Sequence, residues 1–318
     1  MAVLDFERPL VELAQRIEAL RAAEREGGDD DVAAQVAVLE TQARALEREV
    51  FGALGPWEKV QLSRHPDRPY TLDYVSAMFT DFVELHGDRC YGDDAAVVGG
   101  LARFRGEPVV VIGHQKGRGV KENVRRNFGM PHPEGYRKAL RLMELADRFR
   151  RPLVTLIDTP GAFPGLGAEE RGQGEAIGRC LAVMSGLRVP VIAVVIGEGG
   201  SGGALALGVA NRVLMLEFAT YSVITPEGCA SILWKDSARA PEAAEAMKVT
   251  AEHCLALGVA DELIAEPPGG AHRDPAGAAA RVAAAVARSL DAVKGSSPEQ
   301  LVEARYARFK RLASYASG

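Results

Sequence analysis

The chain has 318 residues, of which 47 % are hydrophobic and 25 % charged, the balance of a globular protein long enough to bury a substantial core. A formal net charge of -5 and an isoelectric point near 5.8 argue against nucleic acid or an anionic membrane as the main partner. The four cysteines are scattered without a CxxC pair, which favours reduced thiols and argues against a zinc site within this chain. The sequence shows neither a signal peptide nor an apolar run that reaches a membrane span, so the expected location is the cytoplasm.

Residues 1–55 are predicted to form an N-terminal helical hairpin. Apolar residues recur at helical spacing over residues 8–26 and again over 31–52, with charges between them. Gly27 and Gly28, followed by aspartates, are typical of a turn between two antiparallel helices. Such a hairpin is either a docking arm for a partner or a helical pair that packs on its own body, and both interpretations stay open.

Residues 56–295 are predicted to form an α/β domain, and the basic segment 296–318 a helical tail or a mobile end. Short β-branched runs alternate with helical segments from residue 97 onward, and strands joined by helical crossovers imply largely parallel pairing. The predicted strands are 97–98, 109–112, 153–157, 189–196, 213–216 and 221–224, and the predicted helices are 73–86, 134–150, 168–187, 202–210, 241–256 and 276–293.

The most informative segment is Val191–Ala206, where an apolar strand runs into a glycine-rich turn and then into an Ala/Leu helix. Glycine allows another group to approach the backbone closely, and the amides that begin a helix favour negative charge. The turn is therefore suited to hold an anion or an oxyanion. The simpler alternative is a tight turn without a ligand, which five glycines within Gly197–Gly203 make less favoured.

A dinucleotide-binding enzyme is one function that this turn allows. Gly197, Gly199 and Gly202 match the G-x-G-x-x-G pattern after a strand, and Glu217 ends the next strand in the manner of a ribose-binding acid. Against this, the motif lies deep in the chain, after two strand–helix units, whereas such a motif normally opens its domain. An NAD-dependent oxidoreductase is therefore kept as the alternative function.

A serine hydrolase is a second possibility, because Gly199–Gly203 formally matches G-x-S-x-G around Ser201. A catalytic triad would also need an acid and a histidine, for which His253 or His272 can be nominated. Those histidines lie in polar surroundings without distinctive context, and a string of glycines satisfies many patterns.

An oxyanion hole for an enolate or a thioester is the third possibility, and a second glycine-rich turn supports it. The predicted strand 153–157 is followed by Asp158–Gly167, which contains Phe163. Its Asp-Thr-Pro-Gly resembles an element of GTP-binding proteins, but no phosphate-binding G-x-x-x-x-G-K-[ST] loop precedes it. Two such turns from neighbouring strands are expected to face one pocket, where one backbone donor is worth about a hundredfold to a thousandfold in rate.

Taken in order, these segments resemble the alpha carboxyltransferase subunits of bacterial acetyl-CoA carboxylase, from Leu4 to about Asp274. Departures from the family's pattern are mild: Phe163 stands where Tyr is usual, and Gly174 and Thr225 each stand where Ser is usual. The segments that carry the resemblance are Arg64–Tyr74, Gly113–Arg118, Arg126–Pro131, Pro133–Ala139, Asp158–Gly161, Gly167–Gln173, Gly197–Ala206, Ser222–Lys235 and Gly269–Arg273.

The resemblance implies a crotonase-like fold, in which ββα units stack into a spiral, and half of a two-subunit active site. A beta subunit would supply the acetyl-CoA half and a zinc ribbon. The alpha subunit would face carboxybiotin on a biotin carboxyl carrier protein, which a biotin carboxylase loads. The implied reaction transfers a carboxyl group from carboxybiotin to acetyl-CoA, giving malonyl-CoA for fatty acid synthesis. The implied assembly is alpha-two beta-two, with no cofactor bound covalently and no metal in this chain.

The resemblance also implies roles for particular residues. The amides of Gly202 and Gly203, with Ala204 as a further candidate, would stabilise the biotin oxyanion. The turn Gly161–Gly165, with Phe163, would line the biotin pocket. A basic segment that includes Lys116 and Arg118 would meet the CoA phosphates or the carrier protein, or is simply a solvated loop. Glu198 either holds the glycine-rich turn through backbone hydrogen bonds or is a surface acid.

Overall fold

The computed structural model describes residues 3–25 and 30–312, and its centre is an eight-stranded mixed sheet. The strand order is β1-β2-β3-β4-β5-β6-β8, with β7 beside β5. The pairs β1–β2 and β2–β3 are antiparallel, and every pair from β3 to β8 is parallel. The predicted α/β core with largely parallel pairing is confirmed. The strands are β1 Thr80–Glu84, β2 Val97–Phe104, β3 Glu107–His114, β4 Leu153–Thr159, β5 Val191–Gly200, β6 Arg212–Leu216, β7 Thr220–Ser222 and β8 Glu262–Ile264.

The centre of the sheet is buried on both faces. Every residue of β4 is buried, and all of β5 except Glu198 is buried as well. Their pairing sets Val154 opposite Ile192 and Leu156 opposite Val194. Such unbroken apolar runs suit parallel strands that are covered by helices above and below. These two strands therefore form a rigid base for the turns that follow them.

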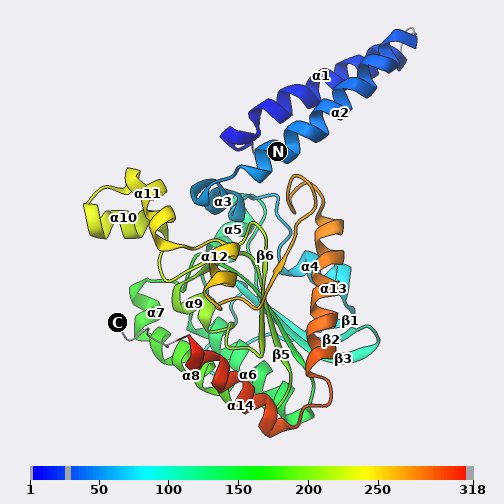
Figure 1. The fold of residues 1–318 in the computed structure, drawn as a ribbon. Coiled ribbons are helices and arrows are strands. Elements are labelled where there is room, and N and C mark those ends of the chain that lie inside the picture. Colours follow the sequence, from blue (N-terminus) through cyan, green and yellow to red (C-terminus); the bar gives the residue numbers. More distant parts are fainter. Residues whose placement is uncertain (1–2, 26–29, 313–318) are drawn as a thin grey trace.

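Helices cover both faces of the sheet. Helices α6 and α8 lie on one face, with α14 against α8, whereas α4 and α13 lie on the other (Figure 1). The helices are α1 Arg8–Arg25, α2 Asp30–Gly52, α3 Pro56–Ser63, α4 Thr71–Met78, α5 Gly119–Arg125, α6 Pro133–Phe149, α7 Leu166–Glu170, α8 Gln173–Gly186, α9 Ser201–Leu205, α10 Pro226–Trp234, α11 Ala240–Met247, α12 Ala251–Ala256, α13 Pro275–Val293 and α14 Pro298–Arg311, with short 3-10 turns at Asp5–Glu7, Asn127–Gly129 and Ser237–Arg239.

Four predicted helices differ from the structure, and the one predicted over 202–210 is the short α9, which ends at Leu205. The helix predicted over 168–187 is divided into α7 and α8 at Gly172, where φ is +81°, and that over 241–256 is divided at Lys248, where φ is +56°. A left-handed residue ends a helix because the backbone leaves the helical region. The helix predicted over 73–86 ends at Met78, and the alternating Thr80–Glu84 instead pairs with β2 as an edge strand.

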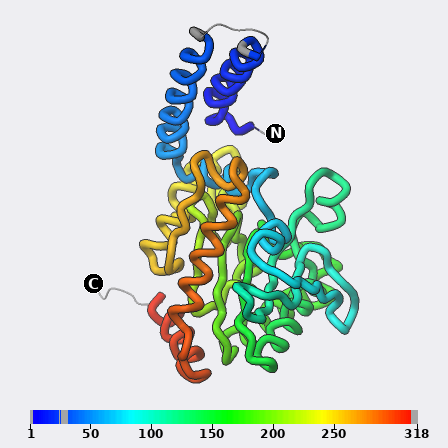
Figure 2. Tube along the Cα trace, turned by 90° about the vertical axis from the view of Figure 1, so that its right-hand side faces the viewer, coloured from blue at the N-terminus to red at the C-terminus, as the bar shows by residue number. Residues whose placement is uncertain are grey.

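The predicted N-terminal hairpin is present, and it projects from the body of the protein (Figures 1 and 2). Its helices α1 and α2 pack along each other, while the turn predicted at Gly27 and Gly28 lies outside the described residues. At its base, Leu10 and Phe51 pack with Leu62 and Phe218 of the body. Most of the hairpin therefore extends beyond the core, and its role as a docking arm stays a prediction.

A buried polar cluster anchors the start of the hairpin. Glu7 accepts hydrogen bonds from His272 Nε2 at 3.0 Å, Arg273 Nη2 at 3.1 Å and the Leu4 amide at 3.1 Å. The ring of His65 lies against that of His272, with 4.3 Å between centroids and a tilt of 39°. Burial alone would raise the pKa of Glu7, but the donors from His272 and Leu4 outweigh it and lower the pKa to about 2.

One basic side chain of the C-terminal helix α14 points into the protein. Arg305 is buried, and its guanidinium donates to the carbonyls of Leu187 at 2.9 Å and Val189 at 3.2 Å and to Asn211 Oδ1 at 2.7 Å. These acceptors lie at or beside the start of β5, so the helix satisfies backbone groups there that water does not reach. Within the described residues no helix is long and apolar enough to span a membrane.

We predict that Glu7→Gln lowers the free energy of unfolding by about 2 kcal/mol at pH 7, because a charged buried acceptor is lost. Since the folded pKa of Glu7 lies below the unfolded one, its contribution is complete above the unfolded value of 4.5 and is lost as pH falls toward 2. Urea unfolding should show that the difference in unfolding free energy between wild type and variant is smaller at pH 4 than at pH 7 by roughly 1 kcal/mol. The exposed Glu12→Gln is the control, and a pH-independent difference would contradict the assignment.

Candidate functional site

Two glycine-rich turns meet at the carboxyl edge of the sheet. We call residues 158–167, which begin with the last two residues of β4, the first glycine loop. Residues 197–203, at the end of β5 and the start of α9, are the second glycine loop. A Cβ on Gly200 would lie 2.1 Å from the Pro160 carbonyl oxygen, and one on Gly203 would lie 2.5 Å from the Ala162 nitrogen. The loops thus pack backbone against backbone, which only glycine permits. The two turns are therefore in contact, whereas a pocket shared by both turns stays a prediction, because the cavity beside Gly202 has no lining residue from the first glycine loop.

The two glycines proposed as oxyanion donors lie in different surroundings. Gly202 is half-buried and lines a cavity of about 300 Å³ together with Ser201, Leu205 and Tyr221. A Cβ on Gly202 would meet only Ile177 Cγ2, at 3.7 Å. No side chain caps the start of α9, so these first-turn amides have no side-chain acceptor. Gly202 is therefore the accessible member of the pair.

Gly203 and Ala204 are buried beneath the loops. A Cβ on Gly203 would lie 2.7 Å from the Tyr136 hydroxyl in addition to its contact with Ala162. Tyr136 is fully buried, and burial raises the pKa of its phenol well above the usual range, so the hydroxyl stays neutral. His114, also fully buried, lies against the backbone of Gly203, and burial lowers the pKa of its imidazole to about 3. The floor beneath Gly203 is thus polar but uncharged.

The first glycine loop holds an aromatic ring over its own backbone. The ring of Phe163 lies 4.6 Å from that of His132, and a Cβ on Gly165 would come within 2.3 Å of Phe163 Cε1. The Phe163 amide donates to the Pro131 carbonyl at 3.0 Å, and Gln173 Nε2 donates to the Phe163 carbonyl at 3.0 Å. The loop residues predicted to line the biotin pocket are therefore held in place by hydrogen bonds and by contacts with the Phe163 ring.

Lys116 lies in a buried ionic cluster rather than in a solvated loop. Its ammonium is 2.7 Å from Asp158 Oδ1 and 2.8 Å from Glu198 Oε1. Arg64 reaches Glu198 Oε2 at 2.9 Å from the other side and Glu227 Oε1 at 2.6 Å. We call these five residues the ionic cluster. Its carboxylates Asp158 and Glu198 belong to the first and second glycine loops respectively.

The charges of the ionic cluster support one another. Burial alone would lower the pKa of Lys116, but Asp158 and Glu198 outweigh it and hold that pKa above its usual value. Burial would raise the pKa of Glu198, yet Lys116 and Arg64 lower it. For Asp158 burial prevails over Lys116, and the pKa of this carboxyl is raised. Glu198 is therefore an internal acid that neighbouring cations keep ionised, which decides against the surface-acid interpretation.

Arg118 lies apart from Lys116, at the surface. Its guanidinium pairs with Asp73 Oδ2 at 2.8 Å and stacks over the Tyr70 ring at 4.8 Å. The helix α5 that follows has no buried residue. The substrate-binding roles given to Lys116 and Arg118 stay predictions, and in the structure both cations contact carboxylates of this chain.

Sequence reasoning did not find Arg64, Asp158 or Glu227 as members of the site. In the sequence Asp158 belongs to the motif shared with GTP-binding proteins and to a segment of the family resemblance, and Arg64 and Glu227 belong only to segments of that resemblance. A signal was nevertheless present. Adjacent parallel strands β4 and β5 each bear an acid near the end, Asp158 three residues before Gly161 and Glu198 directly before Gly199. Two acids so placed require a cation between them.

The hydrolase and dinucleotide interpretations find no support in the geometry. Ser201 does lie in a strand-to-helix turn with φ of +56°, but His253 hydrogen bonds Thr250 and His272 hydrogen bonds Glu7. Neither histidine is therefore positioned as its base. For a ribose, Glu217 would need a free carboxylate, yet its Oε2 accepts the Glu266 amide at 2.9 Å.

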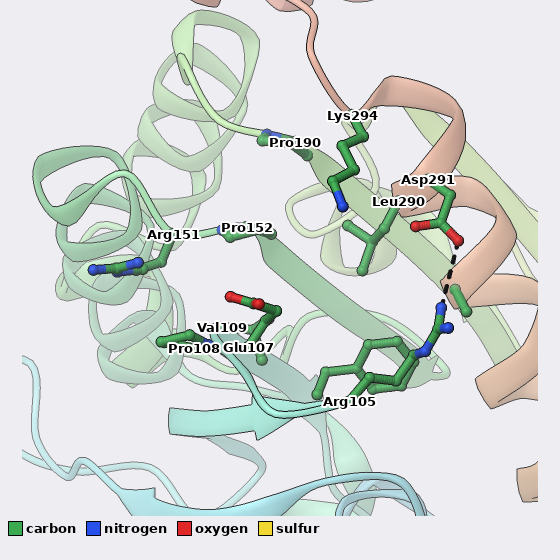
Figure 3. A pocket seen from close by; sticks show the side chains of 12 residues that line it. Arg105, Glu107, Pro108, Val109, Arg151, Pro152, Pro190, Leu290, Asp291 and Lys294 are labelled. Carbon is green, nitrogen blue, oxygen red and sulfur yellow. Dashed lines mark hydrogen bonds and ion pairs between the residues drawn. The ribbon is translucent and has the colours of Figure 1, made fainter.

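A further cavity of about 500 Å³ lies at the opposite edge of the sheet (Figure 3). Its lining includes Pro152 and Pro190, which directly precede β4 and β5. Arg105 and Asp291 form an ion pair of 3.4 Å across one side. This cavity is separated from the glycine loops by the length of the strands, so it forms no part of the candidate site.

The sequence matches a family model described as acetyl co-enzyme A carboxylase carboxyltransferase-like over residues 3–313. A relative named acetyl-coenzyme A carboxylase carboxyl transferase subunit alpha, from Sorangium cellulosum, is 59 % identical over 314 residues, which cover 99 % of this chain and 98 % of the relative. The protein of the same name from Thioalkalivibrio sulfidiphilus is 57 % identical over 318 residues, with coverage of 99 % and 98 %.

Solved structures show the same fold at lower identity. A transcarboxylase 12S structure with hydrolysed methylmalonyl-coenzyme A superposes with a TM-score of 0.57 at 24 % identity, over 71 % of this chain and 42 % of that chain. A malonate decarboxylase hetero-tetramer from Pseudomonas, in complex with coenzyme A, gives a TM-score of 0.55 at 21 % identity, over 70 % and 91 %. These likenesses concern the fold alone, and they confirm the predicted crotonase-like architecture.

We predict that Gly200→Ala lowers the free energy of unfolding by about 3 kcal/mol, because its methyl group would overlap the Pro160 carbonyl and force the two loops apart. Gly178→Ala is the matched control, since this exposed position inside α8 has open space around it. That change should stabilise the protein by about 0.5–1 kcal/mol. Denaturant midpoints measure both, and equal effects at the two positions would refute the backbone contact.

Proposed function

Because this chain belongs to the acetyl co-enzyme A carboxylase carboxyltransferase-like family, we propose that its two glycine loops form the site of carboxyl transfer. The activity is that of the alpha carboxyltransferase subunit of acetyl-CoA carboxylase, which gives malonyl-CoA for fatty acid synthesis. The relatives give no support to the alternative of an NAD-dependent oxidoreductase.

The observation that carries the assignment of the site is the contact between main chains at Gly200 and Gly203. It leaves a turn that has no side chain at Gly200, Gly202 and Gly203, and Gly202 lines a cavity of about 300 Å³. Amides fixed in this way stabilise negative charge that develops on a carbonyl or ureido oxygen, and each is worth about a hundredfold to a thousandfold in rate. We assign the oxyanion role to Gly202 and Gly203, with Ala204 continuing the turn.

The co-substrate proposed for this site is carboxybiotin, carried by a biotin carboxyl carrier protein and loaded by a biotin carboxylase. Gly161, Phe163 and Gly165 of the first glycine loop would flank its bicyclic ring, which suits the apolar side chain of Phe163. The chain's own groups then supply positioning and electrostatic stabilisation rather than a nucleophile. The biotin is carried by another protein, so no cofactor is bound covalently here.

A beta subunit is the proposed partner that completes the site, in an alpha-two beta-two assembly in the cytoplasm. It would supply the acetyl-CoA half and a zinc site of its own. Exposed apolar side chains beside both loops support this arrangement: Leu166, which follows Gly165, is 76 % exposed, and Val223, which lines the Gly202 cavity, is 79 % exposed. Such side chains favour burial against another protein.

We predict that the isolated chain forms no malonyl-CoA from acetyl-CoA and carboxybiotin, and that addition of the beta subunit restores the activity. The physical reason is that one chain presents only one side of the site. Liquid chromatography of the CoA thioesters measures the product, with the beta subunit alone as the control. Full activity of the isolated chain would contradict the two-subunit site, and hydride transfer with NAD would favour the oxidoreductase.

We predict that Gly202→Val in the assembled enzyme lowers kcat by about a hundredfold, because an isopropyl group shields the amide from the oxyanion. The position tolerates a side chain sterically, as the first atom would meet only Ile177 at 3.7 Å, so the unfolding midpoint should hardly change. Gly203 is less suitable for this test, since a Cβ there would also displace Ala162. The control is Gly178→Val on the exposed face of α8, and undiminished turnover of Gly202→Val would remove the oxyanion assignment.

A further inference from the structure

We propose that Lys116 is a positioning residue that fixes the distance between the two glycine loops by bridging Asp158 and Glu198. The proposal rests on the function assigned to those loops above. It departs from the expectation that Lys116 binds an anionic substrate group. The role follows from where the three side chains leave the sheet and from how their charges are balanced.

The three residues follow adjacent parallel strands. Lys116 lies just beyond the end of β3, Asp158 near the end of β4 and Glu198 near the end of β5. Asp158 directly precedes the Thr-Pro-Gly of the first glycine loop, and Glu198 lies within the second. The ammonium of Lys116 lies 2.7 Å from the carboxylate of Asp158 and 2.8 Å from that of Glu198. One cation therefore connects the first residues of both glycine loops.

The two carboxylates require this cation. The side chain of Asp158 is 3 % exposed and that of Glu198 is 12 % exposed, so water screens their repulsion weakly. The Glu198 amide also donates to Asp158 Oδ1 at 3.1 Å, which draws the loops together at the same place. Without Lys116 the acids would repel each other across the contact on which the loops depend.

The remaining neighbours hold Lys116 and Glu198 in place. Arg64 pairs with Glu198 at 2.9 Å on the side away from Lys116, and Glu227 holds Arg64 at 2.6 Å. A Cβ on Gly129 would lie 2.7 Å from Lys116 Cγ, so the stem of the lysine is packed against backbone. With its side chain 12 % exposed and two acids in contact, Lys116 is committed to the protein rather than open to a substrate phosphate.

The test is Lys116→Met in the complete enzyme with its beta subunit, assayed for malonyl-CoA formation. Misplacement of one loop against the other should lower kcat by about a hundredfold, while KM for acetyl-CoA changes less than about twofold. Lys59→Met is the matched control: this lysine, 15 % exposed, pairs with Glu252, which belongs to neither loop, and kcat should be kept. A rise in the KM for acetyl-CoA of Lys116→Met, with kcat unchanged, would overturn the proposal and would favour a contact between Lys116 and the substrate.

A rescue experiment separates positioning from substrate binding. Lys116→Met combined with Asp158→Asn removes one charge of each sign, so the buried repulsion disappears and kcat should recover about tenfold over the single variant. A lysine that binds substrate would give no recovery. If Lys116→Met does not fold, Glu198→Gln, which keeps the shape but weakens the bridge, should lower kcat about tenfold with KM unchanged. Unchanged kcat in that variant would also overturn the proposal.

The assigned function and this inference fail in different ways. If the wild-type complex forms no malonyl-CoA, the function of the loops is wrong. If the wild-type complex is active and the Lys116 and Glu198 variants keep its kcat, only the bridging role is wrong.

Discussion

Two loops that touch main chain to main chain define what this molecule can do. Side chains at Gly200 or Gly203 would separate Pro160 and Ala162 from the turn into α9, and the contact between the two loops would be lost. The buried strands β4 and β5, paired from Leu153 and Val191 onward, deliver both loops to the same edge. The closely packed core therefore holds the backbones of the two glycine loops at a fixed distance from each other.

Two sets of buried ion pairs hold the loops at this edge of the sheet. The ionic cluster joins the loops through Lys116, and behind it Arg68 forms a fully buried pair with Glu266 at 2.7 Å. Arg68 also donates to the Ile196 carbonyl at 3.0 Å, directly before the second glycine loop. Glu266 in turn accepts the Phe218 and Ala271 amides at 3.0 Å and 2.6 Å. Buried ion pairs of this kind add little to the net stability, and they favour one arrangement of the segments that they join.

The sequence predicted those features that depend on local pattern. Unbroken apolar runs identified β4 and β5, and the glycine-rich turns after them predicted the edge where the site lies. It did not predict features that depend on tertiary contact. Lys116 stands in a row of basic residues, and only its place beyond β3 separates it from the exposed Arg118. The edge strand β1 was missed because pairing with β2, not its composition, decides its conformation.

The inward-facing Arg305 has a consequence for biosynthesis. It is the donor for the Val189 carbonyl, and 116 residues separate the two in sequence. While the ribosome is still making the intervening segment, the carbonyls at the start of the central strand lack this donor and depend on water. The nascent chain can collapse early around β4 and β5. The carbonyls before β5 gain their hydrogen bonds from Arg305 only after α14 has left the ribosome.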